Sequence, residues 1–245
     1  MIESLHISKF RNLEDIRIDK LKRMNLIVGR NGMGKTNILH WLAEQPGYPF
    51  IYMPDTIDSG GLQLCQLSNK IIDASEVSMI TEVLQLIDPR IRSIDMEVFD
   101  YTDGLGLNVW FHFEDRSKRH IDNAGRGLYR LFVLALCALG ASYRGEGIRL
   151  LIDNFEQGFH YTVQEPIWKW LFALAAERNM QIFATTHSLD CIESFSMVDD
   201  TRGGTEGFLF RLGRSVRISN RGQIIATDFD YENLWCRIRE EMDVR

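Results

Sequence analysis

The chain has 245 residues, 45% of them hydrophobic, which is enough for one large domain or two small ones. Its formal net charge of −6 argues against binding nucleic acid by bulk charge, although a local basic face is compatible with it. No apolar run has the length of a membrane span, and the first residues lack a signal-peptide pattern. The four scattered cysteines form no C-x-x-C pair, which indicates reduced thiols. We therefore expect a cytoplasmic protein that is not bound to a membrane.

The predicted elements begin with two strands. Apolar and polar residues alternate over residues 2–10 and again over 13–18, as in an antiparallel pair. A short apolar run at 25–28 then predicts a buried parallel strand, and apolar residues at helical spacing over 38–42 predict a helix. The chain is thus expected to open with an antiparallel pair, a buried strand and a helix.

A glycine-rich segment between this strand and this helix matches the phosphate-binding pattern G-x-x-x-x-G-K-T, known as Walker A. Its residues are Gly29, Arg30, Asn31, Gly32, Met33, Gly34, Lys35 and Thr36, with Asn37 directly after them. Glycine lets backbone N–H groups turn toward phosphate oxygens, and the start of the next helix adds free N–H groups. Lys35 would reach the β- and γ-phosphates, and the Thr36 hydroxyl would hold Mg²⁺. A glycine turn before an ordinary helix is the plainer alternative, but the strand–loop–helix order favours nucleotide binding by all these residues except Arg30.

The rest of the chain alternates strand-like and helix-like segments. Strands are expected at 50–53, 94–99, 107–113, 149–152, 181–184, 207–212 and 216–218. Helices are expected at 68–87, 128–141 and 163–178, and from Tyr231 onward. This order predicts an α/β fold with a mainly parallel central sheet flanked by helices, preceded by an N-terminal antiparallel β subdomain.

Three further features could bind parts of a nucleotide. Asp153 ends the apolar strand 149–152, as in the Walker B pattern, and would bind Mg²⁺ directly or through water. His187 follows the next buried strand and could contact the γ-phosphate or orient the attacking water. Both should meet the glycine loop, because ligands of open parallel sheets bind beyond the carboxyl ends of the strands. The turn at 123–127 opens a helix and offers N–H groups to a phosphate. A purely structural role is the alternative for each feature.

These pieces, in this order, resemble the ABC-type ATPases of the SMC/RecF/OLD group. The matching segments are Phe10-Arg11-Asn12, Gly125-Arg126-Gly127 as a divergent signature loop, Leu150 to Asp153 as Walker B, Asp153 to His160, and Thr185 to Ser188 as the switch-histidine loop. Residues from Gly222 to Arg245 also look like the endings of small stand-alone OLD-type ATPases. The resemblance implies one head domain over 1–245 with a lid or insert at about 56–122, and it leaves no room for a TOPRIM nuclease domain or a long coiled coil.

The resemblance implies ATP and Mg²⁺ as cofactors and a homodimer in which two heads clamp two nucleotides. Asn123, Gly125 and Gly127 of one subunit would then close on the glycine loop of the other, and Arg11 would contact nucleotide in its own subunit. A separate effector protein, such as a nuclease, is implied too, in DNA transactions or defence against phage. Two basic groups could contact DNA directly: Lys9, Arg11, Lys20, Lys22 and Arg23, and Arg211, Arg214, Arg217 and Arg221.

One position departs from the family pattern at the catalytic step. Asn154 stands where the family usually has the Glu that positions or deprotonates water, and an amide cannot take up a proton as a carboxylate does. Three interpretations are open: Glu156 replaces this Glu, hydrolysis is slow and ATP holds a closed dimer, or His187 and a partner residue act instead. We favour slow hydrolysis. The competing function is a nucleotide-gated scaffold or sensor with negligible turnover, and a transporter subunit is a third alternative.

Overall fold

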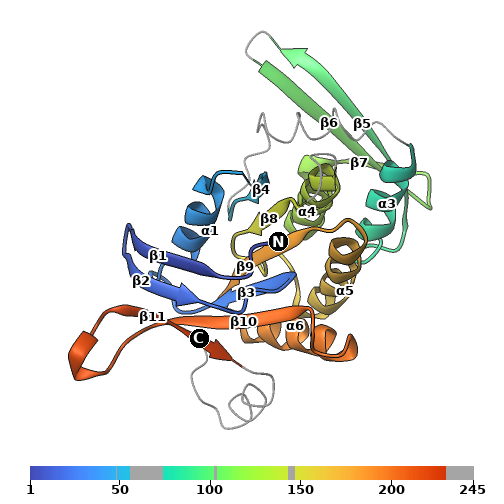
Figure 1. Ribbon diagram of the computed structural model, residues 1–245. Helices are drawn as coiled ribbons and strands as arrows, with labels where there is room; N and C mark the ends of the chain where they lie inside the picture. Colours follow the sequence, from blue (N-terminus) through green and yellow to red (C-terminus); the bar gives the residue numbers. More distant parts are fainter. Residues whose placement is uncertain (48, 56–73, 102–103, 143–146, 230–245) are drawn as a thin grey trace.

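A six-stranded sheet in the order β11-β10-β3-β9-β8-β4 forms the centre of the protein (Figure 1). The computed structural model describes residues 1–47, 49–55, 74–101, 104–142 and 147–229. The parallel strands are β3 (Met24–Val28), β4 (Phe50–Met53), β8 (Arg149–Ile152), β9 (Gln181–Thr186) and β10 (Gly207–Arg214). Only β11 (Ile224–Phe229) runs antiparallel, beside β10. The mainly parallel sheet predicted from the sequence is therefore confirmed.

Helices and a second sheet cover the two faces of this central sheet. One face carries α4 (Arg126–Ser142), α5 (Tyr161–Glu177) and α6 (Leu189–Thr201), and the other carries α1 (Lys35–Glu44) with the antiparallel pair β1 (Leu5–Phe10) and β2 (Leu13–Ile18). Successive side chains of a strand point to opposite faces. Leu150 and Ile152 accordingly join the core under α4 to α6, whereas Leu151 joins the core under α1 and β1–β2.

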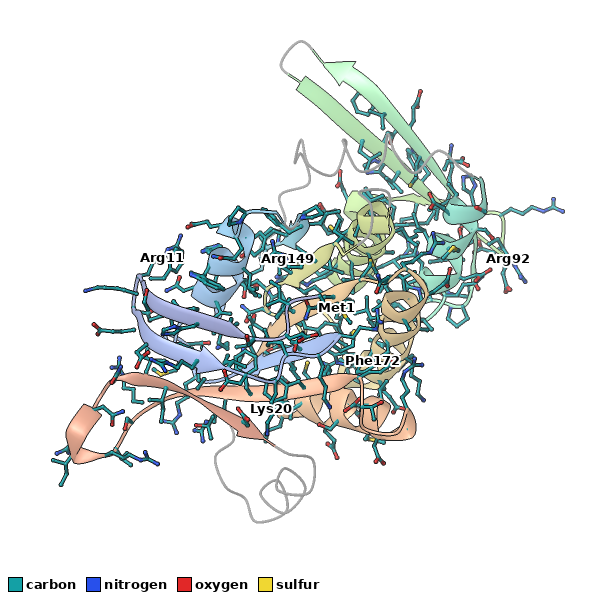
Figure 2. The ribbon with its side chains drawn as sticks, viewed as in Figure 1. Met1, Arg11, Lys20, Arg92, Arg149 and Phe172 are labelled. Atoms are coloured by element: carbon teal, nitrogen blue, oxygen red, sulfur yellow. The ribbon has the colours of Figure 1, made fainter. Side chains whose placement is uncertain are left out.

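A buried arginine ties α1 to the sheet. Arg149 at the start of β8 has no exposed surface, and its guanidinium donates hydrogen bonds to the carbonyl oxygens of Leu42 and Gln45 at the end of α1 (Figure 2). The last carbonyl oxygens of a helix have no hydrogen-bond donor within the helix, and here the Arg149 guanidinium supplies one. This contact fixes the helix whose first residues close the glycine loop.

A three-stranded antiparallel sheet projects from the α4 side of the molecule (Figure 1). Its strands are β5 (Ile91–Tyr101), β6 (Gly104–Phe113) and β7 (Lys118–His120), and α3 (Ala74–Leu84) precedes it. The ring of Phe111 packs edge-on against Phe132 of α4, with ring centroids 6.3 Å apart. This sheet falls within the segment expected to form a lid or insert.

The tail is where the sequence-based prediction was wrong. Residues 216–218 do not form a strand: they lie between β10 and β11, where Ile218 begins a short 3-10 helix (Ile218–Asn220), and Val216 is 88% and Ile218 98% exposed. Ser215 turns the chain there, because its hydroxyl bonds the Asn220 side chain and accepts from the Arg217 N–H. The second tail strand is β11 instead. The helix expected from Tyr231 and the first part of the helix expected over 68–87 lie outside the described residues.

Two other elements have weak sequence signals. Helix α6 was not predicted, although Ser188 caps it by accepting a hydrogen bond from the Cys191 N–H. Strand β7 is only three residues long and fully polar.

Cys137 and Cys191 are buried free thiols, and burial raises the pKa of Cys137 to about 12. Within the described part of the chain, every helix is too short or too polar to cross a lipid bilayer.

Candidate nucleotide site

The glycine loop follows β3 and ends at α1, as the sequence predicts. A Cβ at Gly29 would lie 2.6 Å from the Leu212 carbonyl oxygen, and one at Gly34 would lie 2.7 Å from the Leu13 side chain. Gly34 also has a φ of 89°, which L side chains rarely adopt. Both positions therefore require glycine, and the loop is held against β10 on one side and β2 on the other.

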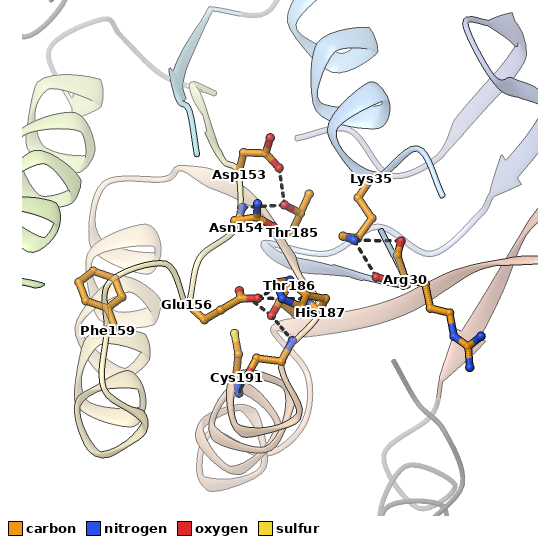
Figure 3. Close-up of polar contacts among 12 residues, drawn as sticks. Arg30, Lys35, Asp153, Asn154, Glu156, Phe159, Thr185, Thr186, His187 and Cys191 are labelled. Carbon is orange, nitrogen blue, oxygen red and sulfur yellow. Dashed lines mark hydrogen bonds and ion pairs between the residues drawn. The ribbon is translucent and has the colours of Figure 1, made fainter. Parts of the chain in front are cut away.

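Lys35 is drawn back into this loop. It is 6% exposed, and its Nζ donates to the carbonyl oxygens of Gly29 at 2.7 Å and Arg30 at 3.2 Å (Figure 3). Burial lowers the pKa of Lys35, and the negative charges of Glu156 and Asp153 oppose that shift. The Lys35 ammonium thus carries its charge opposite two carboxylates. It donates hydrogen bonds to backbone oxygens, and a bound phosphate could replace these contacts.

Asp153 meets the glycine loop at the end of β8. Its carboxylate lies 2.8 and 3.1 Å from the Thr36 hydroxyl, and it accepts from the hydroxyls of Thr185 at 2.6 Å and Tyr52 at 3.3 Å. Burial, followed by the Asp153 charge, raises the pKa of Tyr52, so this phenol remains a donor. Thr36 of the glycine-rich loop and Asp153 at the end of β8 are therefore in direct contact.

This donor set fits Mg²⁺. Thr36 and Asp153 present only oxygen atoms, which hard cations prefer. Among the residues that the structure describes, no group of three or more His, Cys, Asp or Glu side chains is arranged to hold a metal ion. Mg²⁺ commonly uses one or two protein oxygens and completes its shell with phosphate and water. Thr36 and Asp153 could supply such protein oxygens.

Glu156 and His187 form a second pair at the same edge (Figure 3). The Glu156 carboxylate lies 2.9 Å from Nδ1 of His187, and it accepts from the His187 backbone N–H at 3.1 Å and the Thr186 hydroxyl at 2.7 Å. Asn154 has a φ of 49°, and its backbone N–H donates to the Thr185 hydroxyl at 2.8 Å. The tight turn at Asn154 thus points the chain so that Glu156 reaches the end of β9.

The turn at 123–127 leads into α4 on the far side of the sheet from α1. Asn123 ends a short 3-10 helix (Ile121–Asn123) and is exposed, and Gly125 has a φ of 86° with open space around it. Gly127 packs closely, since a Cβ there would lie 2.9 Å from the Gly158 carbonyl oxygen. Asn123 and Gly125 are therefore exposed, whereas Gly127 packs against the segment that follows Asp153.

Two N-terminal residues brace the glycine loop. The Arg11 guanidinium bonds the side chains of Asn37 and His40 in α1. Asn12 donates to the Gly32 carbonyl oxygen at 3.3 Å and accepts from Asn37 at 2.6 Å. The expected sites Arg11 and Asn37 thus touch each other.

Sequence reasoning assigned no role in the site to three residues: Tyr52, Thr185 and Arg130. The positions of Thr185 and Tyr52 could have indicated a role in the site, because each stands near the carboxyl end of a buried strand next to β8. Arg130 lies within an apolar helix, where the sequence alone indicates an exposed face. In the structure it is 4% exposed and donates to backbone carbonyls at the ends of β4 and β8.

Two curated relatives share short stretches with this chain. A stretch of 43 residues is 40% identical to an uncharacterized protein of Methanocaldococcus jannaschii, covering 18% of this chain and 20% of that protein. A stretch of 38 residues is 47% identical to the DNA replication and repair protein RecF of Clostridium acetobutylicum, covering 16% of this chain and 10% of that protein. The chain thus matches about a fifth and a tenth of the lengths of these relatives.

Solved structures share the fold over almost the whole chain. An SMC head bound to the C-winged helix domain of ScpA gives a TM-score of 0.66 at 12% identity, covering 96% of this chain and 99% of that one. An SMC head of Pyrococcus furiosus gives 0.60 at 10% identity, covering 97% and 98%. An ATP-binding cassette of an ABC transporter gives 0.56 at 13% identity, covering 98% and 94%. At these identities the likeness establishes the fold.

A protein-family model connects this fold to a family. The model described as "AAA domain, putative AbiEii toxin, Type IV TA system" matches residues 63–192, just over half of the chain. The match includes the turn at 123–127, Asp153 and His187. The chain therefore belongs to this AAA-domain family, and it has the fold of SMC head domains and ATP-binding cassettes.

Proposed function

We propose that this chain binds Mg·ATP where β3, β8 and β9 end, hydrolyses it slowly, and uses it to close a homodimer. The observation that carries the proposal is the contact between Thr36 and Asp153, which joins the phosphate loop to the acidic strand end. Bound Mg²⁺ would supply positive charge to the phosphates during phosphoryl transfer. The nucleotide-binding residues are proposed to be Arg11, Gly29, Asn31, Gly32, Met33, Gly34, Lys35, Thr36, Asn37, Asn123, Gly125 and Gly127.

Slow hydrolysis follows from the residues around the attacking water. Asn154 can bond water but cannot accept its proton. Glu156 could accept one, yet both of its oxygens are already engaged by Thr186 and His187. We propose that Glu156 and His187 orient the attacking water and that Asp153 binds the metal. Loss of a positioned base costs about 10²–10⁴ in rate, so ATP would persist in the site.

The proposed dimer is isologous, with each signature-like turn facing the other subunit's glycine loop. The exposed tip at Asn123 and Gly125 supports this, because Gly125 directly precedes α4, whose first N–H groups can receive a phosphate. In this proposal residues 1–245 form one head domain, and the segment 56–122 with its projecting sheet is the lid or insert.

We further propose that the closed dimer controls a separate effector in DNA transactions or antiviral defence. The loop between β10 and β11 supports a contact with another macromolecule, because exposed Val216 and Ile218 stand there among exposed Arg214, Arg217 and Arg221. Similarity of a short stretch to a DNA replication and repair protein is in keeping with this role. DNA is the partner that we would test first, by measuring how binding falls with salt.

A nucleotide-gated sensor with negligible turnover is the second candidate, and Asn154 is the observation in its favour. It requires the same dimer but no product formation.

ATP turnover and solution mass, measured for the wild type and Lys35→Ala, test the proposal. We expect wild-type turnover below about 0.1 s⁻¹, because a loss of about 10²-fold or more lowers the typical ~10 s⁻¹. The mass should double with ATP, and Lys35→Ala should stay monomeric without turnover. Dimerisation without measurable product would select the sensor. A wild type that neither hydrolyses ATP nor changes mass with it would overturn both candidates.

A further inference from the structure

The hairpin of β10 and β11 runs past the rest of the central sheet (Figure 1). The pairing of β10 with β3 ends at Arg211, whereas its pairing with β11 continues to Arg214. The hairpin tip, residues 214–223, therefore stands at the end of a two-stranded ribbon. The base of this ribbon lies against the glycine loop, since a Cβ at Gly29 would lie 2.6 Å from the Leu212 carbonyl oxygen. The tip is thus joined through its base to the proposed ATP site.

Hydrogen bonds within the hairpin tip fix its shape. The backbone N–H groups of Ser215 and Gly222 donate to the carbonyl oxygens of Gln223 and Ser215, each at 2.8 Å. The Arg214 guanidinium donates to the Gly222 carbonyl oxygen at 2.9 Å, and the Ser215 hydroxyl donates to Oδ1 of Asn220 at 2.6 Å. Because these contacts already hold the tip in one conformation, binding a partner there would order little additional chain.

Two aliphatic side chains of the tip are almost completely in water. Val216 is 88% and Ile218 98% exposed, and the next most exposed large apolar side chain that the structure describes is Tyr161, at 60%. Folding gains nothing from an apolar side chain that stays in water, and apolar groups exposed together typically mark a surface that binds a partner. The tip therefore has the character of a binding element.

The charged residues of the tip are all basic. Arg214, Arg217 and Arg221 are exposed, and residues 207–227 include no aspartate or glutamate. A groove of about 730 Å³ lies beside the tip, and its polar lining consists of Arg214, Asn220, Arg221 and Gln223, with Asn12 and Glu14 from the β1–β2 pair. Glu14 is the one carboxylate among these lining residues, and it belongs to β2. The tip thus offers guanidinium groups to phosphates.

We propose that the hairpin tip binds duplex DNA in its minor groove, with Ile218 inserted between two base pairs and Arg217 and Arg221 on the flanking phosphates. Two-stranded β-ribbons enter DNA grooves. Proteins that bind the minor groove commonly combine basic side chains with an apolar wedge, such as isoleucine, that unstacks one base step and bends the duplex. The inference rests on the proposed role in DNA transactions and deepens it by assigning the element that contacts DNA.

A protein partner with an acidic and apolar surface is the competing explanation. Charge favours DNA, because protein–DNA interfaces are much more positively charged than protein–protein interfaces, and the tip holds arginines without any acidic residue. The formal net charge of −6 also confines DNA binding to a local basic surface of this kind. The two partners predict different results, since only DNA gives binding to a bare duplex with a salt dependence set by the arginines.

Fluorescence anisotropy at a series of salt concentrations tests the phosphate contacts, with ATP present and a duplex of about 20 base pairs that has a central, easily kinked TA step. Arg217→Gln and Arg221→Gln should each reduce the slope of log K against log salt concentration by about 0.9. Arg116→Gln is the matched control, because Arg116 is exposed between β6 and β7, on the opposite side of the molecule (Figure 1). Equal slopes for all three variants and the wild type would overturn the proposal.

Energy transfer between dyes on the two ends of the same duplex tests the wedge. The wild type should bend the duplex, and Ile218→Gln should lose the bend and bind about tenfold more weakly, as expected when a buried isoleucine contact is lost. Its salt slope should stay that of the wild type, because no phosphate contact changes. Met197→Gln, at a 39% exposed position on α6, is the control and should bend the duplex normally. Equal bending by Ile218→Gln and the wild type would refute the wedge.

ATP turnover and solution mass separate this inference from the proposed function. All four variants alter exposed side chains outside the nucleotide site, so their ATP turnover and ATP-dependent mass should equal those of the wild type. A wild type that closes with ATP but binds no duplex at low salt would overturn the inference and leave the ATP-driven dimer standing. Failure of the proposed ATP site would be visible without DNA, as a wild type that neither hydrolyses ATP nor changes mass.

Discussion

The Thr36 hydroxyl lies 2.8 Å from an oxygen of Asp153, although 117 residues separate them in the chain. Thr36 lies in the first turn of α1 and Asp153 directly follows β8, so the contact exists only because a single strand, β9, separates β8 from β3 in the sheet. Removing either side chain should therefore affect metal binding more than folding. We expect Asp153→Asn to weaken Mn²⁺ binding in the presence of ATP by at least about 10–100-fold. Electron paramagnetic resonance measures this loss, and an affinity equal to that of the wild type would place the metal elsewhere.

The identity of the residue that activates water can be read from two variants. Asn154→Glu restores a carboxylate directly after Asp153 and should raise turnover, up to the ~10²–10⁴ that a positioned base contributes. Glu156→Gln should then have a smaller effect, because its carboxylate is held by Thr186 and His187. Steady-state phosphate release gives both rates. Unchanged turnover in Asn154→Glu, with none left in Glu156→Gln, would make Glu156 the base.

Arg130 should be a strong determinant of stability. Its guanidinium satisfies carbonyl oxygens at the ends of β4 and β8, and each acceptor left buried without a donor costs about 1–3 kcal/mol. We expect Arg130→Met to lower the free energy of unfolding by about 3 kcal/mol or more in urea. Arg126→Met, at an exposed position one turn earlier in α4, is the control and should change it little. Equal stability of the two variants would contradict the role of this guanidinium.

The sequence could place the glycine loop, Asp153 and His187 together because their backbone context is local. Each lies directly after a short apolar run, and parallel strands end at one edge of a sheet. The roles of Tyr52 and Arg130 depend on which strands are neighbours, and no local pattern gives the order of β4 and β8. The strand predicted at 216–218 is wrong for a related reason. Apolar residues form a strand only where other residues cover them, and Val216 and Ile218 are exposed.

Asp199 should give a distinctive pH dependence of stability. It accepts a hydrogen bond from the Gly207 N–H at 2.7 Å, but burial is the larger effect and raises the pKa of this carboxyl above 3.8. The folded state then binds the proton more tightly than the unfolded state. The stabilisation is fully present below pH 3.8 and is lost as the pH rises through the raised pKa. Asp199→Asn removes this titration, so the stability of the wild type relative to the variant should fall as pH rises across that window. Urea unfolding at a series of pH values measures the difference, and a constant difference would contradict the shift.

The signature-like turn can be tested with a pair of matched glycines. Gly125 and Gly203 both have positive φ, 86° and 88°, and open space around the position of a Cβ. Asp tolerates this conformation, so Gly125→Asp and Gly203→Asp should both fold. Only Gly125→Asp brings a negative charge to the turn that would receive the partner's phosphate. We expect it to weaken the ATP-dependent dimer by at least about tenfold, or ~1.4 kcal/mol. Light scattering with ATP measures the dimer. If both variants dimerise like the wild type, the turn does not bind phosphate across the interface. If both lose the dimer equally, backbone strain rather than charge is responsible.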